Sequence, residues 1–278
     1  GTHASMNPLA FSLDRLQRAR AEIDDAIHRT PLVRSETLSE RVGVPVYLKC
    51  ENLQKTGSFK VRGALHRIQA LSEDERRRGV ITISAGNHAQ AVAWAASAAG
   101  VASTVVMPEG ASQTKAAASQ GYGAQVILHG DPGEAFRKAF ELADERNLTF
   151  VHPFDDEYVV AGHASCMLEV LEDLPDVATV VVPVGGGGLA SGLAVASEVV
   201  APDLALWCVE PVGAAAMHRS FQEGHAVHLD AVSTRLGPER RDHGLRGVDA
   251  GDLQAAPVQG QRQAPGADTK LQYPASPG

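Results

Sequence analysis

The chain contains the run Thr179-Val180-Val181-Val182-Pro183-Val184, followed directly by Gly185-Gly186-Gly187-Gly188. The apolar run is typical of a buried strand, and the residues from Leu189 to Val200 predict a helix. Four glycines allow the backbone to turn tightly between the two. A strand that leads through a glycine turn into a helix indicates an α/β fold.

Strands and helices alternate on both sides of this stretch. Short apolar runs predict strands at 80–83, 104–107, 124–128, 149–151 and 204–209, and helices are expected at 12–27, 88–99, 112–119, 133–146, 157–172 and 213–222. Such alternation implies right-handed crossovers and parallel sheets covered by helices. We predict a two-lobed α/β protein, with a large lobe of residues 6–79 and 157–234, a small lobe of residues 80–156 and a cleft between them.

Composition narrows the class of partner. The 278 residues carry a net charge of -8, which argues against nucleic acid or an anionic membrane surface. No stretch approaches the ~20 apolar residues of a membrane span. The three cysteines are far apart and indicate reduced core residues of a cytoplasmic protein, and no zinc-site spacing occurs. Residues 1–5, before Met6, resemble a cloning remnant.

The four glycines also suggest an anion site. Their N–H groups can converge on one point, and the helix that follows adds its positive N-terminal partial charge, so Gly185, Gly186, Gly187 and Gly188 predict a phosphate cradle. The loop lacks a Gly-Lys-Ser/Thr ending and the Gly-x-Gly-x-x-Gly register. Neither a nucleoside triphosphate nor a dinucleotide is therefore indicated. A structural turn is the alternative.

A lysine lies in an unusual position at Gly57-Ser58-Phe59-Lys60-Val61-Arg62-Gly63-Ala64. We expect Ser58 to cap a helix that runs through Leu65 and Ile68, which places Lys60 in its first turn. The positive partial charge there disfavours a cation, so this lysine titrates more easily and suits Schiff-base chemistry. The alternative is an ordinary surface lysine.

A third stretch, Ser84-Ala85-Gly86-Asn87-His88, follows a predicted strand and opens a helix. Its amides and the Ser84 hydroxyl can hold a carboxylate, and Asn87 can bond a ring hydroxyl. A capped turn without a ligand is the alternative. A phosphate cradle, a carboxylate cradle and a lysine suited to a Schiff base form a set that pyridoxal phosphate would satisfy.

These motifs resemble those of a known family. The Ser58 and Ser84 stretches, His152-Pro153-Phe154-Asp155 and Pro183-Val184 with the glycines occur in the order found in the threonine dehydratase and serine racemase family, the fold type II pyridoxal-phosphate enzymes. Tyr122-Gly123-Ala124 and Val209-Glu210-Pro211 are also similar. The resemblance covers about Met6 to Thr234 and implies a tryptophan synthase β-like fold.

The resemblance also implies roles for individual residues. Lys60 would be the catalytic Schiff-base lysine, Phe59 would pack on the cofactor ring, Asn87 would bond its hydroxyl and Gly185 to Gly188 its phosphate. Ser84, Ala85, Gly86, Asn87 and His88 would hold the substrate carboxylate. Racemases of the family have a serine where Ala85 stands, so dehydration is favoured over racemisation.

Two further positions depart from the family pattern. Members with a divalent-cation site use a glutamate, a carbonyl four residues on and an acidic residue two later; Glu210 and Ala214 match, but Ala216 supplies no carboxylate. A cation site would then be weak or absent. Gly162-His163-Ala164-Ser165 replaces the usual Gly-Gln-Gly-Thr.

The function implied is dehydration and deamination of L-threonine or L-serine to a 2-oxo acid and ammonia by a cytoplasmic homodimer. A related amino-acid racemase, a hydroxy-aspartate dehydratase and a cofactor-binding protein without turnover are the alternatives. The resemblance ends before 235–278, a segment rich in Gly, Pro, Arg and Gln with no Ile, Phe or Trp. Because this composition buries little apolar surface, we expect a disordered tail there.

Overall fold

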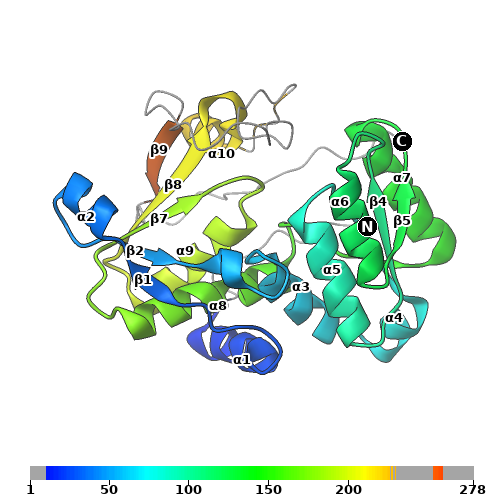
Figure 1. The fold of residues 1–278 in the computed structure, drawn as a ribbon, viewed down its shortest axis with the longest axis horizontal. Coiled ribbons are helices and arrows are strands. Elements are labelled where there is room, and N and C mark those ends of the chain that lie inside the picture. Colours follow the sequence, from blue (N-terminus) through cyan, green and yellow to red (C-terminus); the bar gives the residue numbers. More distant parts are fainter. Residues whose placement is uncertain (1–10, 226, 228, 230–252, 259–278) are drawn as a thin grey trace.

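A computed structural model describes residues 11–225, 227, 229 and 253–258, and Figure 1 shows their two-lobed arrangement. One lobe is built on a four-stranded parallel sheet in the order β5-β4-β3-β6. Its strands are β3 (Val80–Ile83), β4 (Ser103–Met107), β5 (Gln125–Leu128) and β6 (Thr149–Phe150). Its helices are α4 (Glu73–Arg78), α5 (Asn87–Ala98), α6 (Gln113–Gly121) and α7 (Pro132–Arg146). Alternating strands and helices produce this sheet because each helix returns the chain to the same strand direction.

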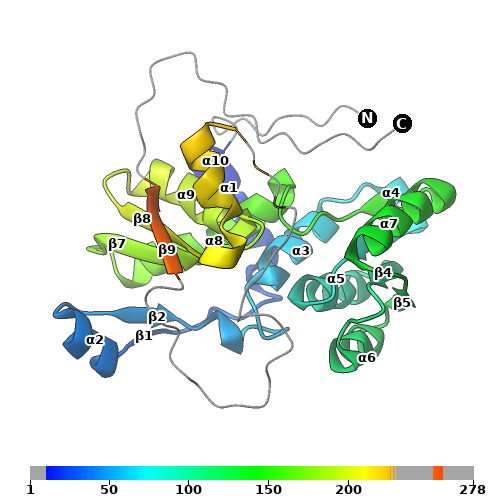
Figure 2. The ribbon, with the colours of Figure 1, turned by 90° about the horizontal axis from the view of Figure 1, so that it is seen from above.

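The other lobe contains a three-stranded sheet in the order β7-β8-β9. Strands β7 (Thr179–Pro183) and β8 (Ala205–Pro211) are parallel, and β9 (Leu253–Val258) is antiparallel to β8. Around them lie α1 (Leu13–Asp24), α8 (Glu157–Asp173), α9 (Gly188–Val200), η3 (Val212–Ala214) and α10 (Ala216–Glu223). A two-stranded antiparallel sheet of β1 (Leu32–Arg34) and β2 (Tyr47–Lys49), with α2 (Glu36–Val42) and η2 (Glu51–Leu53), extends from this lobe (Figure 2).

Helix α3 (Lys60–Gln69) joins the two lobes. It packs against α8 on one side and against α5 on the other. Its buried residues Val61, Leu65 and Ile68 belong to one apolar cluster with the α5 residues Val92 and Ala96. The element that begins at Lys60 is therefore fixed by contacts with both lobes (Figure 1).

The α/β fold with parallel sheets and helices is confirmed, and the predicted strands and helices occur within a few residues of their expected ends. The prediction that Ser58 caps α3 is wrong. Phe59 already has helical torsion angles and is the residue before the helix, and the Ser58 hydroxyl has no hydrogen-bonding partner in the described part of the chain. The predicted placement of Lys60 in the first helical turn is confirmed.

Part of the segment 235–278 departs from the predicted disordered tail. Leu253–Val258 forms β9, whose backbone pairs with β8 from Leu206 to Pro211. The segment offers few apolar side chains for burial, but this strand is held by backbone pairing to a neighbouring strand. Residues 235–252 and 259–278, together with the segment 1–5, lie outside the described residues.

In the part of the chain that the structure describes, no helix has both the length and the apolar character needed to cross a bilayer.

Candidate active site

Lys60 lies in the first turn of α3, and its side chain reaches the 152–155 segment. Its Nζ donates a hydrogen bond to the Pro153 carbonyl oxygen at 2.6 Å and lies 5.3 Å from the centre of the Phe59 ring. Loss of solvation on burial lowers the pKa of the amine from 10.5 to about 8. An amine with this pKa is in part neutral near physiological pH, so it can act as a base or a nucleophile.

The segment 152–155 lies between Lys60 and the glycine loop. The Phe154 side chain covers the loop so closely that a Cβ at Gly186 would lie 2.1 Å from a ring carbon of Phe154, and a Cβ at Gly188 would lie 2.9 Å from Phe154 atoms. No side chain larger than hydrogen fits at these two positions. The loop therefore presents backbone alone, at the N-terminus of α9, where N–H groups point outward.

The predicted carboxylate cradle lies at the carboxyl end of β3. Within it the Gly86 N–H donates to the Ser84 Oγ at 3.0 Å. Ala85 and Asn87 are exposed, and the Asn87 Oδ1 accepts a hydrogen bond from Lys115 Nζ at 3.5 Å. The loop thus has accessible polar groups, with an additional cation supplied from α6.

His88, at the end of this cradle, is buried and lies near Lys60. Its Nε2 is 3.2 Å from the Val151 carbonyl oxygen. Burial first, and then the charge on Lys60, lower the pKa of His88 to about 3, so its ring is neutral at physiological pH. His88 contacts the Val151 carbonyl and Lys60 the Pro153 carbonyl, so the end of the predicted cradle and the lysine lie against neighbouring residues of one segment.

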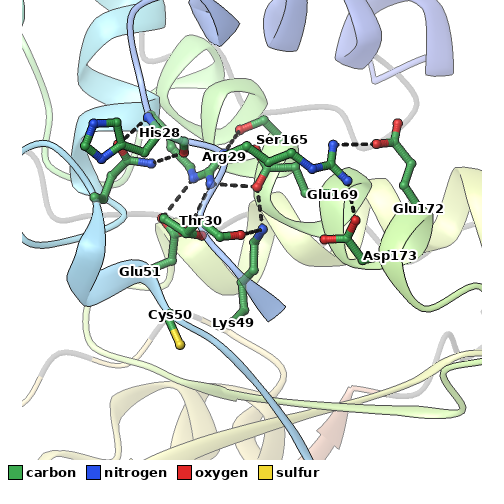
Figure 3. A network of polar contacts seen from close by, with 12 residues as sticks. His28, Arg29, Thr30, Lys49, Cys50, Glu51, Ser165, Glu169, Glu172 and Asp173 are labelled. Atoms are coloured by element: carbon green, nitrogen blue, oxygen red, sulfur yellow. Dashed lines mark hydrogen bonds and ion pairs between the residues drawn. The ribbon is translucent and has the colours of Figure 1, made fainter. Parts of the chain in front are cut away.

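A network of ion pairs fixes the helix that carries Lys60 (Figure 3). Arg62, two residues further on, is fully buried and donates to both oxygens of Glu51 and of Glu169 at 2.6–2.9 Å, with Ser165 Oγ at 3.0 Å. Lys49 Nζ lies 2.5 Å from Glu169 Oε2. Burial lowers the pKa of Arg62, but the bonds to Glu51 and Glu169 outweigh it and raise that pKa. The start of α3 is thus tied to α8, η2 and β2.

The predicted cation ligands have another use in the structure. Glu210 is buried, and its two oxygens accept hydrogen bonds from the Met217 N–H at 3.0 Å and the His218 N–H at 2.8 Å. The carboxylate therefore satisfies the first turn of α10, which follows Ala214. Among the residues described, no three His, Cys, Asp or Glu side chains are grouped closely enough to hold a metal ion. The cation site at Glu210 and Ala214 stays a prediction.

Several residues at the site were not predicted from the sequence to have a role there. Pro153 holds the Lys60 amine through its backbone, so nothing in its side chain indicates the contact. Lys115 reaches Asn87 from a different helix. His163, on α8, is fully buried beside Phe59, with the ring centres 5.0 Å apart. The only signal for His163 is its replacement of the family's glutamine.

The fold and the site define an α/β protein in which a partly neutral lysine and a glycine loop at a helix N-terminus both contact the 152–155 segment. The family described as "Pyridoxal-phosphate dependent enzyme" matches residues 23–254. The chain is 46% identical over 225 residues to the L-threonine ammonia-lyase of Thermotoga maritima, and 45% identical over 220 residues to that of Geobacter sulfurreducens. The chain belongs to the pyridoxal-phosphate dependent enzymes.

Solved structures agree with this assignment. Maize serine racemase superposes with a TM-score of 0.78 at 34% identity, covering 81% of this chain and 68% of that one. The processed form of threonine deaminase isoform 2 from Solanum lycopersicum superposes with a TM-score of 0.75 at 38% identity, covering 84% of this chain and 66% of that one. The two ammonia-lyase matches cover 81% and 79% of this chain but only 56% and 55% of the relatives, so the chain spans about half of their length.

Proposed function

We propose that the chain is a pyridoxal-phosphate-dependent ammonia-lyase that converts L-threonine or L-serine to a 2-oxo acid and ammonia. The observation that supports this most directly is the Lys60 amine, whose pKa of about 8 places it between its protonated and neutral forms near physiological pH. The relatives named L-threonine ammonia-lyase add independent support for the substrate class.

The residues of the site fit the cofactor of the family. The loop of Gly185 to Gly188 suits a phosphate group, because it has no side chains of its own and leads into the N-terminus of α9. Asn87 is exposed and can donate its amide N–H to a ring hydroxyl, since Lys115 occupies its oxygen. Bound there, pyridoxal phosphate would supply an electron sink that makes the substrate Cα proton acidic.

The protein's own groups then bind the substrate and move the proton. The Ser84 hydroxyl and the backbone N–H groups of residues 84–88 would hold the carboxylate, with Lys115 as a nearby cation. The neutral Lys60 amine would take the Cα proton, and the Pro153 carbonyl would hold the resulting ammonium. His88, neutral and buried, adds no competing positive charge beside Lys60.

A racemase is the second candidate, since serine racemases are among the structural relatives. Proton return on the face opposite Lys60 needs a donor, and Ala85 has no hydroxyl. Ammonia release is therefore favoured over racemisation. A cytoplasmic homodimer, as the family resemblance implies, completes the proposal.

The test is an assay of the cofactor-loaded protein. With L-threonine we expect 2-oxobutyrate and ammonia in equal amounts, and with Lys60→Ala we expect neither product nor the visible absorbance of the bound cofactor. Borohydride reduction followed by peptide mapping should label Lys60. Loaded protein that retains this label but releases no 2-oxo acid from either amino acid would instead be a cofactor-binding protein without turnover.

The variant Ala85→Ser separates the two candidate activities. It restores a hydroxyl opposite Lys60, so we expect D-serine to form from L-serine while ammonia release continues. Chiral chromatography of the recovered serine measures this. Wild-type protein that racemises serine as fast as it deaminates it would favour the racemase.

A further inference from the structure

His163 is a buried polar side chain that the fold alone does not account for. It lies in the middle of α8 and has no exposed surface. Within the described part of the chain, neither of its ring nitrogens has a hydrogen bond of ordinary geometry. Buried polar groups normally have such a partner, and an exception calls for an explanation.

The ring occupies the point at which three helices meet. A Cβ on Gly63 of α3 would lie 2.7 Å from His163 Nε2, and a Cβ on Gly192 of α9 would lie 2.8 Å from His163 Cβ. The edge of the ring meets Phe59, with ring centres 5.0 Å apart and planes at 72°. Glycines on two helices thus make room for this one side chain.

The imidazole is neutral in this position. Burial first, and then the charge on Lys60, lower the pKa of His163 well below its usual range, while a backbone group of Gly188 acts in the opposite direction. A backbone group that favours the protonated ring is a carbonyl, because it accepts from a ring N–H. Gly188 lies four residues before Gly192 on the same face of α9, and Gly192 contacts His163, so the Gly188 carbonyl lies on the side of α9 that faces the ring. It makes no hydrogen bond of ordinary geometry with the ring.

Packing alone gives no reason for a histidine here. An apolar side chain of similar volume would fill the same space without burying two polar atoms. A function that uses a ring N–H would give a reason, and the Gly188 carbonyl on the facing side of α9 belongs to the predicted phosphate loop.

We propose that His163 is a positioning residue of the phosphate-binding loop, an inference that rests on the proposed function. When an anion occupies the loop, the ring donates to the Gly188 carbonyl, which as an oxygen with two lone pairs can also accept its helical bond. The N–H of the same peptide group belongs to Leu189 and points the opposite way, out of the N-terminus of α9. Holding the carbonyl thus directs that N–H toward the anion.

The test compares pyridoxal 5′-phosphate with pyridoxal, which lacks the phosphate. For His163→Leu we expect the dissociation constant of pyridoxal 5′-phosphate to rise about tenfold, as for one lost hydrogen bond. The dissociation constant of pyridoxal should change less than about twofold. His163→Gln retains an N–H donor, so both constants should stay near those of wild type. Fluorescence titration of the cofactor-free protein measures them without turnover.

Thermal unfolding of the cofactor-free variants separates positioning from packing. His163→Leu removes two unpaired polar atoms, so we expect its midpoint to equal or exceed that of wild type. The control is His66→Leu, because His66 is also a buried histidine but its Nδ1 lies 2.7 Å from the Tyr158 carbonyl oxygen. This control should lose stability and keep the wild-type ratio of the two dissociation constants.

Two results would overturn the positioning role of His163 and leave the proposed function intact. One is an unchanged pyridoxal 5′-phosphate constant in His163→Leu, and the other is an equal loss for both ligands. His163→Met serves the same comparison if the leucine variant does not fold. Wild-type protein that binds neither ligand would overturn the proposed function as well.

Discussion

Two cations lie two residues apart at the start of α3, and their surroundings are opposite. Arg62 is surrounded by acceptors, with Glu51, Glu169 and Ser165 all within 3.0 Å. Lys60 donates instead to a backbone carbonyl, that of Pro153, and has two neutral histidines near it. The pKa of Arg62 is raised and that of Lys60 is lowered to about 8.

The difference separates a structural charge from a reactive one. A buried charge with acceptors on every side is stable as a charge, and removing one partner leaves the rest uncompensated. A buried amine without a carboxylate loses its proton more easily and can react. The paired arginine holds the helix in place, so that the reactive lysine can be presented at a fixed position.

The largest expected effect comes from breaking the Arg62 cluster. Glu169→Gln leaves Arg62 and Lys49 with an uncompensated buried charge, and we expect a loss of about 3–5 kcal/mol in the free energy of unfolding. The matched control is Glu172→Gln on the same helix, whose side chain is 52% exposed; it should cost less than about 1 kcal/mol. Urea unfolding measures both. Equal losses of unfolding free energy in the two variants would show that burial of the Arg62–Glu169 ion pair does not matter for stability.

Removing the charge of Lys60 should raise the free energy of unfolding, whereas breaking the Arg62 cluster lowers it. In the cofactor-free protein the folded state lowers the pKa of the amine from 10.5 to about 8, so burying the charged form is unfavourable below pH 8. Lys60→Met should raise the free energy of unfolding at pH 7 by about 2 kcal/mol, less than the full pKa difference gives, because the side chain is partly exposed. The gain should shrink between pH 8 and 10.5 and vanish above it.

Lys55→Met is the control for this pH dependence, because Lys55 is exposed in the loop that precedes α3. Its unfolding free energy should follow that of wild type across the range from pH 7 to 11. A stability gain in Lys60→Met that does not change with pH would mean that added apolar packing, and not the removed charge, is responsible.

A smaller effect is expected where a buried carboxylate has backbone partners. Glu210→Gln replaces one acceptor of the α10 N–H groups with a donor, so the variant should lose about 1 kcal/mol in unfolding free energy. Hydrogen exchange of the Met217 and His218 amides would localise the change. Unaltered exchange at both amides would contradict the capping role of Glu210.

The smallest expected change in stability concerns the exposed ion pairs of Glu172 with Arg20 and Arg29, and it occurs at acidic pH. Hydrogen bonds from Arg20 and then Arg29 lower the pKa of Glu172 from 4.5 to about 2. A depressed carboxyl pKa contributes stability above pH 4.5 that is lost as the pH falls toward 2. Glu172→Gln should therefore flatten the stability profile between these values, by an amount reduced by solvent screening. Acid titration at low and high salt measures it.

Local signals in the sequence were enough to predict the main elements. The apolar runs at 80–83 and 179–184, and the glycines after them, determine strand, turn and helix within a few residues, so they could be read without tertiary information. The placement of Lys60 in the first turn followed from the same kind of signal. The β1–β2 pair and β9 were not predicted, because three-residue strands have no detectable period and β9 depends on a neighbour far along the chain.

The surroundings of the site could not be predicted in this way. Whether Lys60 meets a carboxylate or a carbonyl is decided by the 152–155 segment, about 90 residues away in the chain. His163 acquires its importance from glycines on two other helices. Ser58 met the usual preference for a helix cap, yet Phe59 already adopts helical angles and the hydroxyl stays unpaired among the described residues.

The position of α3 also bears on how the protein melts. Its side chains complete the apolar cluster that includes α5, and its backbone lies against Gly162 of α8, where a Cβ would come within 2.5 Å of the Arg62 carbonyl oxygen. Neither lobe can lose its structure without releasing a helix on which the other depends. Calorimetry of the protein should therefore show one cooperative heat-absorption peak, with equal calorimetric and van't Hoff enthalpies, although the fold has two lobes.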